Sequence, residues 1–382
     1  MFRILTVGEI ATAGLARFPA GRYRVGVDVD RPDAILSGPA AKGSQELPEG
    51  LLAVARAGTG AGELPIAQLS ARGIPVFHGH GAGANAVCEL VLAALLMSAR
   101  GLPEIIARMA QQEGLSDDRG ACAQAAPGSE LAGRTLGVVG LGAVGHRVAH
   151  AARCLGMRVL AVDPRLDDGS AQLPADTIRA GSLNELYAGS DFISFHVAMT
   201  AATRHLLHAG ALAHLRRGAV VLNFSYPHVV DNQAVLAGLE QGRISRYLSD
   251  FPLPELAGHD GVTQFPHMGE QTREAADAAA VMVAGQLREF LEHGNVQGAL
   301  NLPTLVLPRQ GASRLCAISR ASARASGRIA VTLGTAGLHI IQMQAAVLDD
   351  LAYALFDLDG RPDQACLARL AATAGVYTVR LL

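Results

Sequence analysis

The stretch "TLGVVGLGAVG", residues 135–145, decides the fold of the central part of this chain. A short apolar run is followed by Gly140, Gly142 and Gly145 in the spacing GxGxxG, and then by a helical pattern. Gly140 permits a tight turn, Gly142 lets the backbone approach a pyrophosphate, and Gly145 lets helix and strand pack closely. The start of the helix adds free amides and the positive end of its dipole. The pattern therefore predicts a dinucleotide-binding turn rather than a purely structural one.

The acidic residue that usually completes this motif is also present. The next predicted strand, "RVLAVD", ends at Asp163, 18 residues after Gly145. An acid at about this distance is expected to bind the ribose hydroxyls of adenosine. Because a carboxylate there would repel a 2′-phosphate, the sequence favours NAD over NADP as the cofactor, and the nearby Arg165 weakens that preference.

Strands and helices alternate on both sides of this motif. From residue 135 to residue 272 the runs "RVLAVDP", "FISFHVAMT", "GAVVLNFS" and "YLSDFP" predict a doubly wound parallel sheet. Residues 1–100 repeat the alternation and predict a second, smaller sheet of the same kind. The apolar stretch 85–112 predicts a long helical region that bridges the two domains and offers a subunit contact, and 113–133 predicts a loop or arm. The last part of the chain, 308–382, predicts the order βαββαβ.

Composition excludes several classes of function. The formal net charge is −2 in 382 residues and no basic block occurs, which argues against a nucleic-acid partner. The longest apolar run is far short of the roughly 20 residues that a membrane span needs. The chain starts without the pattern of a signal peptide, and its five cysteines are scattered without metal-binding spacing. We therefore expect free thiols, a cytoplasmic location and no metal site.

The chain resembles the D-2-hydroxyacid dehydrogenases, and among them the D-3-phosphoglycerate dehydrogenases that carry a C-terminal ACT domain. The resemblance rests on "GRTLGVVGLGAVG", "SDFISFHVAMTAATRHLL", "VVLNFSYPHVVDNQAVLAGLEQGRI", "PHMG" and "NVQGALNLP". It implies a discontinuous substrate-binding domain (1–100 and 273–307), a Rossmann NAD-binding domain (101–272) and an ACT-like domain (308–382). It also implies a homodimer or a larger homo-oligomer.

The resemblance implies a role for individual residues. His267 in "PHMG" matches the family's general acid/base, and Glu255 matches the glutamate that polarises it; a carboxylate beside imidazole favours the charged ring. Tyr226 stands at the position of the family's substrate-binding arginine. The implied NAD contacts are Gly140, Gly142, Ala143, Val144, Gly145, Asp163, Pro164, His196, Val197, Thr203, Asn223, Phe224, Ser225, Asp250, His267 and Gly269. The implied substrate contacts are Gly58, Thr59, Gly60, His78, His80 and Tyr226.

The departures from the family pattern fall on the predicted substrate side. Tyr226 and Pro227 replace an arginine and a glycine, and Gly38 lies where another arginine is lost. A tyrosine offers one neutral hydroxyl, whereas arginine offers a charged pair of parallel donors. His78 and His80 suit a metal pair only in an extended loop, and no third ligand is evident. Because the cofactor turn reads intact, we favour a re-purposed substrate site over an inactive one.

The function that follows is an NAD-dependent oxidoreductase that acts on the CH–OH group of a small, non-standard substrate. Two alternatives stay open: a non-redox enzyme that retains bound NAD, and a catalytically silent NAD-binding regulatory protein. The ACT-like segment contains "ISRASARASG" (318–327) where the family's effector-binding turn carries asparagines. A dimerisation surface is therefore a safer expectation for that domain than feedback by serine.

Overall fold

The computed structural model describes residues 1–41, 47–58, 64–111, 128–167, 169 and 172–382. The chain divides into two compact units, residues 84–272 and residues 1–83 with 273–382, and each is described by itself. Both contain the parallel sheets that the sequence predicts, and the second also contains an antiparallel sheet.

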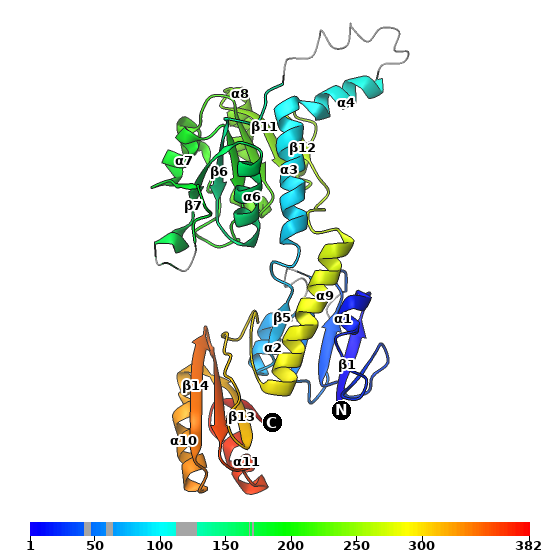
Figure 1. Ribbon diagram of the computed structural model, residues 1–382, viewed down its shortest axis with the longest axis vertical. Helices are drawn as coiled ribbons and strands as arrows, with labels where there is room; N and C mark the ends of the chain where they lie inside the picture. Colours follow the sequence, from blue (N-terminus) through cyan, green and yellow to red (C-terminus); the bar gives the residue numbers. More distant parts are fainter. Residues whose placement is uncertain (42–46, 59–63, 112–127, 168, 170–171) are drawn as a thin grey trace. The chain divides into compact units, whose positions relative to one another are not determined.

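Residues 84–272 form a doubly wound domain around a seven-stranded parallel sheet (Figure 1). The strand order is β12-β11-β10-β9-β6-β7-β8, so the chain proceeds outward from β6 in one direction and then from β9 in the other. Ligands of such sheets bind at the carboxyl ends of the strands, where the order reverses. The strands are β6 (Thr135–Val139), β7 (Arg158–Val162), β8 (Ile178–Arg179), β9 (Phe192–Phe195), β10 (Ala219–Asn223), β11 (Ile244–Ser249) and β12 (Val262–Gln264).

Helices cover both faces of this sheet. Helices α3 (Ala84–Arg100) and α6 (Ala143–Cys154) pack on one face, and α7 (Leu183–Gly189) and α8 (Asn232–Glu240) pack on the other. Strands β6, β9 and β10 are buried at every position, as expected for apolar parallel strands covered on both faces. The sheet is therefore a rigid base for the loops at its carboxyl edge.

The predicted helical region 85–112 is two helices rather than one. α3 ends at Arg100, Gly101 takes a left-handed conformation (φ +60°), and α4 (Leu102–Gln111) follows. Glycine adopts this conformation without steric cost, so it commonly ends a helix. In the described ranges, no helix is long and apolar enough to cross a membrane.

The second unit begins with a five-stranded parallel sheet in the order β2-β1-β3-β4-β5. Its strands are β1 (Phe2–Val7), β2 (Tyr23–Gly26), β3 (Ala34–Ser37), β4 (Ala53–Arg56) and β5 (Val76–His78). Helix α9 (Arg273–Arg288) returns from the end of the other unit and packs with α1 (Thr12–Leu15) on one face, while α2 (Ile66–Ala71) lies on the other. A side chain at Gly14 would begin 2.5 Å from Ala280 Cβ, so α1 and α9 make close backbone contact.

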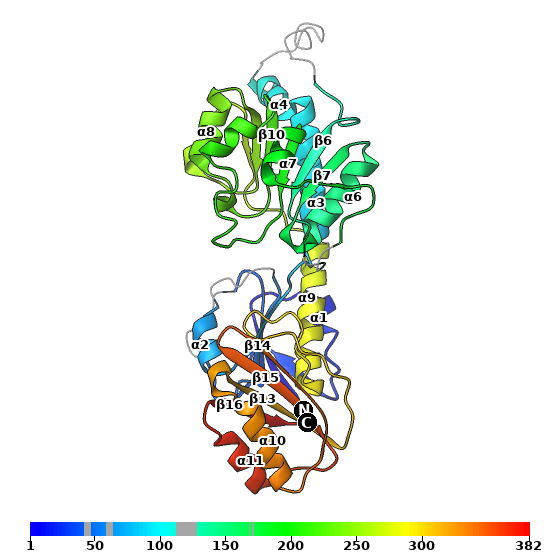
Figure 2. The ribbon, with the colours of Figure 1, turned by 90° about the vertical axis from the view of Figure 1, so that its left-hand side faces the viewer.

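The C-terminal segment has the predicted order βαββαβ (Figure 2). Its elements are β13 (Ser313–Arg320), α10 (Ala325–Thr335), β14 (Ile340–Leu348), β15 (Leu351–Leu358), α11 (Gln364–Ala371) and β16 (Val376–Leu381). The antiparallel sheet has the order β14-β15-β13-β16, with α10 and α11 on one face. Its other face packs against Phe290 and Leu291, which follow α9. The predicted fold class is confirmed in all three parts.

Candidate active site

The predicted cofactor-binding residues lie where parallel strands of the seven-stranded sheet end. They occupy the carboxyl edge of the sheet or the turns that follow its strands. In strand order they are Gly140, Gly142, Ala143, Val144 and Gly145 after β6; Asp163 and Pro164 after β7; His196, Val197 and Thr203 after β9; Asn223, Phe224 and Ser225 at the end of β10; Asp250 after β11; and His267 and Gly269 after β12.

Two of the three glycines of the GxGxxG turn leave no room for a side chain. A Cβ on Gly140, whose φ is +94°, would lie 2.7 Å from the carbonyl oxygen of His196. A Cβ on Gly145 would lie 1.9 Å from the carbonyl oxygen of Gly140. Gly142 is different, because a Cβ there would meet only the Arg165 side chain at 3.9 Å. The space beside Gly142 at the start of α6 is therefore open to a pyrophosphate, which fits a dinucleotide.

Asp163 is buried and already fully hydrogen-bonded. One oxygen, Oδ2, accepts from the Leu141 amide at 2.7 Å and from Arg165 Nη2 at 2.7 Å. The other, Oδ1, accepts from the amide and Nε of Arg165 at 2.9 and 3.1 Å. Burial by itself would raise the pKa of Asp163, but these bonds hold that pKa below its usual value. Asp163 thus fixes the glycine turn, and Arg165 largely neutralises its charge.

His196 is a partly buried, neutral imidazole next to the glycine turn. Its Nε2 lies 2.8 Å from Ser194 Oγ, and its Nδ1 is buried without a hydrogen-bond partner among the described residues. Burial lowers the pKa of His196 to about 3, because the ring cannot be solvated when it carries a charge. Nδ1 is therefore a candidate to meet a ligand or a water at this edge.

The neutral state of His196 makes stability depend on pH. The unfolded chain takes up a proton at this residue below about pH 6.5, whereas the folded chain does not until about pH 3. Stability is thus lost as the pH falls through this range. When the pH falls from about 7 to about 5, the free energy of unfolding should decrease in both proteins. We expect this decrease to be about 1–2 kcal/mol smaller in His196→Asn than in the wild type. Urea unfolding of both proteins measures this, and identical pH profiles would contradict it.

The turn after β10 holds Tyr226 in ordinary extended backbone (φ −146°, ψ 150°). The buried Asn223 donates through Nδ2 to the Tyr226 carbonyl at 2.9 Å and accepts from the Ser225 amide at 3.3 Å. Ser225 Oγ donates to the Val197 carbonyl. Tyr226 has 46% of its surface exposed, and Pro227 begins the short 3-10 helix Pro227–Val229. The hydrogen bonds of Asn223 and Ser225 thus fix the backbone of the turn, while the Tyr226 side chain is exposed.

Asp250 shapes the turn that carries His267. Its two oxygens accept from the amides of Met268 at 2.8 Å and Gly269 at 2.7 Å. A Cβ on Gly269 would lie 2.8 Å from the same carboxylate. His267 has a left-handed backbone (φ +58°), which is unfavourable for a non-glycine residue and is often found at functional sites. Its exposed ring meets Phe251 edge-on with 5.3 Å between centroids.

Glu255 lies in the short 3-10 helix Pro254–Leu256 and does not hydrogen-bond His267 in this structure. Its hydrogen-bond partner within the described residues is Asn232, whose Nδ2 lies 3.4 Å from Glu255 Oε2. Leu253, in the same loop, accepts from Gln264 Nε2 at 2.9 Å. The predicted polarising contact is therefore not made, and the role of Glu255 stays a prediction.

The predicted substrate residues of the other unit follow β4 and β5 of the five-stranded sheet. The carbonyl of Gly58 accepts from the Gly79 amide at 2.8 Å, which ties the two loops together. The rings of His78 and His80 lie 5.4 Å apart. Thr59 and Gly60 lie outside the described residues. Within the described ranges, no group of three His, Cys, Asp or Glu side chains is arranged to hold a metal ion.

The loop after β3 leaves no room for a side chain at Gly38. A Cβ at Gly38 would begin 2.2 Å from the Glu9 carbonyl oxygen, so no larger residue fits without moving backbone. Arg56, which ends β4 at the same edge of this sheet, was not predicted from the sequence. Arg56 donates to the carbonyls of Pro39 and Ala41. The feature of the sequence that could have indicated Arg56 is a positively charged residue at the end of a buried strand.

Comparisons with known proteins agree with this geometry. Residues 92–269 match the family model "D-isomer specific 2-hydroxyacid dehydrogenase, NAD binding domain". A hydroxypyruvate reductase from Thermotoga maritima is 31% identical over 239 residues, which cover 60% of this chain and 74% of that protein. A D-3-phosphoglycerate dehydrogenase from Methanocaldococcus jannaschii is 30% identical over 272 residues, 70% of this chain, and the match spans half the length of that relative.

A solved structure shows the same fold. The crystal structure of a glyoxylate reductase from Paecilomyes thermophila superimposes with a TM-score of 0.62 at 22% identity. The superposition covers 78% of this chain and 98% of that one. The matched residues include the glycine turn, Asp163 and His267. The chain belongs to the D-isomer-specific 2-hydroxyacid dehydrogenase family.

Proposed function

We propose that this protein is an NAD-dependent oxidoreductase that acts on the CH–OH group of a small 2-hydroxy acid, through a substrate site that lacks the customary arginine. The observation that carries the proposal is an intact dinucleotide turn on the same sheet edge as His267. The relatives named as D-3-phosphoglycerate dehydrogenase and hydroxypyruvate reductase support this class of reaction. Tyr226 supports a substrate different from theirs.

In the proposed mechanism, bound NAD supplies the hydride acceptor or donor. The protein contributes a proton carrier: His267 takes the hydroxyl proton during oxidation and returns it during reduction. One set of contacts holds the backbone of the His267 turn, and another touches the His267 ring. Asp250 pins the next two backbone amides, and Phe251 contacts the ring edge. A proton carrier held in this way costs little reorganisation during the reaction.

The proposed role of Tyr226 is to bind the substrate through one hydroxyl. An arginine at this position would grip a carboxylate through two charge-assisted hydrogen bonds, each contributing about 1.5–3 kcal/mol. Losing them is expected to disfavour plain 2-hydroxy acids and 3-phosphoglycerate.

Restoring the arginine tests this proposal. We expect Tyr226→Arg to raise kcat/KM for simple 2-oxo acids at least tenfold, because the extended backbone at 226 accepts any side chain. Tyr226→Phe is the matched control, since it removes the hydroxyl without adding charge, and it should not show this gain. Steady-state NADH oxidation with a panel of 2-oxo acids measures both. Wild-type turnover of 3-phosphoglycerate near a typical enzyme rate of about 10 s⁻¹ would contradict the altered site.

Arg165 should set the preference between NAD and NADP. Its guanidinium covers the Asp163 carboxylate, so repulsion of a 2′-phosphate is reduced. We expect Arg165→Ala to weaken NADPH binding about tenfold while NADH binding is kept or improved. Calorimetric titration of both cofactors measures this directly. Arg158→Ala, at the opposite end of β7, is the matched control. An unchanged ratio of NADH to NADPH affinity in Arg165→Ala would contradict the proposed role of Arg165.

The finer assignments are also proposals. We propose the three-part division into a substrate-binding domain (1–100 and 273–307), an NAD-binding domain (101–272) and an ACT-like domain (308–382). The βαββαβ order supports the last of these. We also propose a homodimer, which the family resemblance supports, and a cytoplasmic location, which the scattered cysteines support. Free thiols at Cys88, Cys154, Cys316 and Cys366 are consistent with a reducing compartment.

A further inference from the structure

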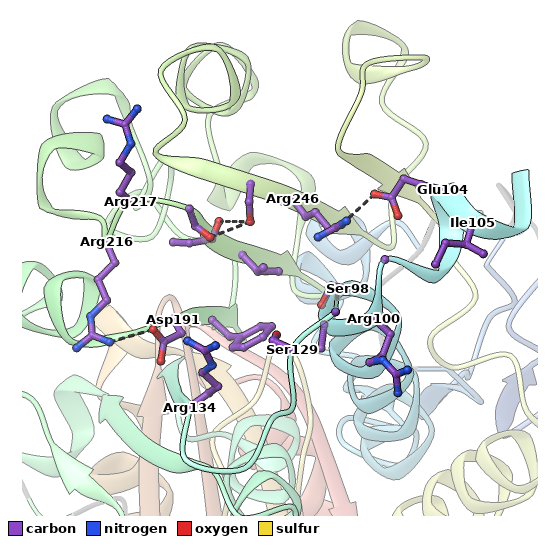
Figure 3. A pocket seen from close by; sticks show the side chains of 18 residues that line it. Ser98, Arg100, Glu104, Ile105, Ser129, Arg134, Asp191, Arg216, Arg217 and Arg246 are labelled. Carbon is purple, nitrogen blue, oxygen red and sulfur yellow. Dashed lines mark hydrogen bonds and ion pairs between the residues drawn. The ribbon is translucent and has the colours of Figure 1, made fainter. Parts of the chain in front are cut away.

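A pocket lies at the amino ends of the central strands of the seven-stranded sheet (Figure 3), the edge opposite the dinucleotide turn. It has a volume of about 420 Å³, within the range of small-ligand sites. The end of α3, the start of α4, and the residues that precede or begin β6, β9, β10 and β11 form its wall. A strand of five residues spans about 16 Å, so this pocket is distinct from the cofactor turn.

The wall of the pocket is strongly basic. Five arginines and two acids line it, a formal net charge of +3. They are Arg100, Arg134, Arg216, Arg217 and Arg246, with Glu104 and Asp191. Figure 3 shows Arg216 and Arg217 on one side, Arg100 and Arg246 on the other, and Arg134 between them. The whole chain has a net charge of −2, so this concentration of positive charge is local.

Two of the five arginines are held by acids and three are not. Arg216 Nη1 lies 2.9 Å from Asp191 Oδ1, and Arg246 Nε lies 2.9 Å from Glu104 Oε1. Within the described part of the chain, Arg100, Arg134 and Arg217 form no ion pair. Guanidinium groups gathered around a cavity without matching acids favour phosphate or carboxylate groups, which accept their paired donors.

Glu104 adds a feature that a purely basic pocket lacks. Its second oxygen, Oε2, is buried and has no hydrogen-bond partner among the described residues. A buried carboxylate oxygen without a donor is unfavourable, and a hydroxyl of a ligand could satisfy it. Gly101 lets Arg246 approach, since a Cβ there would begin 3.0 Å from Arg246 Nη2. Side chains that carry donors for anions and an acceptor for a hydroxyl therefore line one cavity.

We propose that this pocket binds a small polyanion that carries at least one hydroxyl group. Its anionic groups are bound by Arg134, Arg217 and Arg100, and its hydroxyl donates to Glu104 Oε2. Phosphate esters and polycarboxylates share this chemistry. The site is separate from the proposed oxidoreductase site and does not depend on it.

Calorimetric titration of the full chain saturated with NADH tests the proposal, because NADH blocks the pyrophosphate-binding turn. Fructose 1,6-bisphosphate and citrate represent the two sources of anionic groups, and inorganic pyrophosphate lacks the hydroxyl. We expect at least one of the first two to bind, and more tightly than pyrophosphate. Arg134→Gln with Arg217→Gln should weaken that binding at least tenfold, the effect of losing charge-assisted hydrogen bonds. Both arginines are exposed, so folding should be kept.

The matched control is Arg369→Gln, which removes one exposed arginine of α11 in the other unit and should leave the affinity unchanged. Binding that the double variant does not weaken would overturn the site. So would the absence of binding by both fructose 1,6-bisphosphate and citrate. Pyrophosphate binding as tight as theirs would overturn the role of Glu104.

Discussion

Replacing His267 with alanine is expected to lower turnover by about a hundredfold or more, the usual contribution of a positioned proton donor. The reason is local: His267 is the exposed imidazole that the Asp250 hydrogen bonds hold in a strained turn at the carboxyl edge. Binding of NADH should be weakened much less than turnover, because the glycine turn that receives the dinucleotide does not depend on this ring. Turnover is measured as the substrate-dependent change in NADH concentration, and NADH affinity is measured by titration. Together the two measurements separate catalysis from cofactor binding.

The matched control is His214→Ala, which removes an exposed histidine of the same unit near the amino end of β10. It should leave turnover within about twofold of the wild type, since exposed substitutions away from special features change little. If His267→Ala turns over its substrate as fast as the wild type while NAD is still required, the proton carrier lies elsewhere. The dehydrogenase mechanism proposed for this site would then be wrong.

Gly145→Ala is expected to abolish measurable NADH binding, a loss of a hundredfold or more. The added Cβ would begin 1.9 Å from the Gly140 carbonyl oxygen, far inside any real contact distance. Because the obstructing atom is backbone, the strand and the helix must move apart, and the turn between them loses the shape that receives the pyrophosphate. Fluorescence titration with NADH measures the affinity, and thermal unfolding measures the accompanying loss of stability.

Gly142→Ala is the control for this prediction. Its Cβ would meet only a flexible arginine side chain at 3.9 Å, so the fold should keep its melting temperature within a few degrees. Gly145→Ala with wild-type NADH affinity would show that close packing of β6 against α6 is not what shapes the turn. Loss of stability in both variants alike would also contradict the distinction between the two glycines.

Local patterns were sufficient to predict most of the fold. The run before Gly140 becomes a fully buried strand, and the residues after Gly142 become α6, because propensity and periodicity agree there. The βαββαβ order of 308–382 was predictable for the same reason. The break at Gly101 was missed, since apolar residues continue across it and only its positive φ reveals the turn.

Contacts between distant segments could not be predicted in the same way. Sequence spacing indicated that Asp163 follows the second strand, but not that Arg165 occupies its carboxylate. Asp250 was predicted as a cofactor contact, and its two hydrogen bonds to the His267 turn depend on how β11 and β12 end side by side. The basic pocket could not be predicted because its five arginines come from four separate segments that the sheet brings together.

The most direct test of the central claim is whether hydride passes between the nicotinamide and a small substrate. NADH deuterated at the transferring position of its nicotinamide is incubated with the protein and a panel of 2-oxo acids, and the products are analysed by mass spectrometry. We predict a 2-hydroxy acid that has gained one deuterium at C2, formed in proportion to NADH consumed and strongly reduced in His267→Ala. A product without deuterium, formed while NADH stays unconsumed, would show that the protein keeps NAD for other chemistry and would contradict the account.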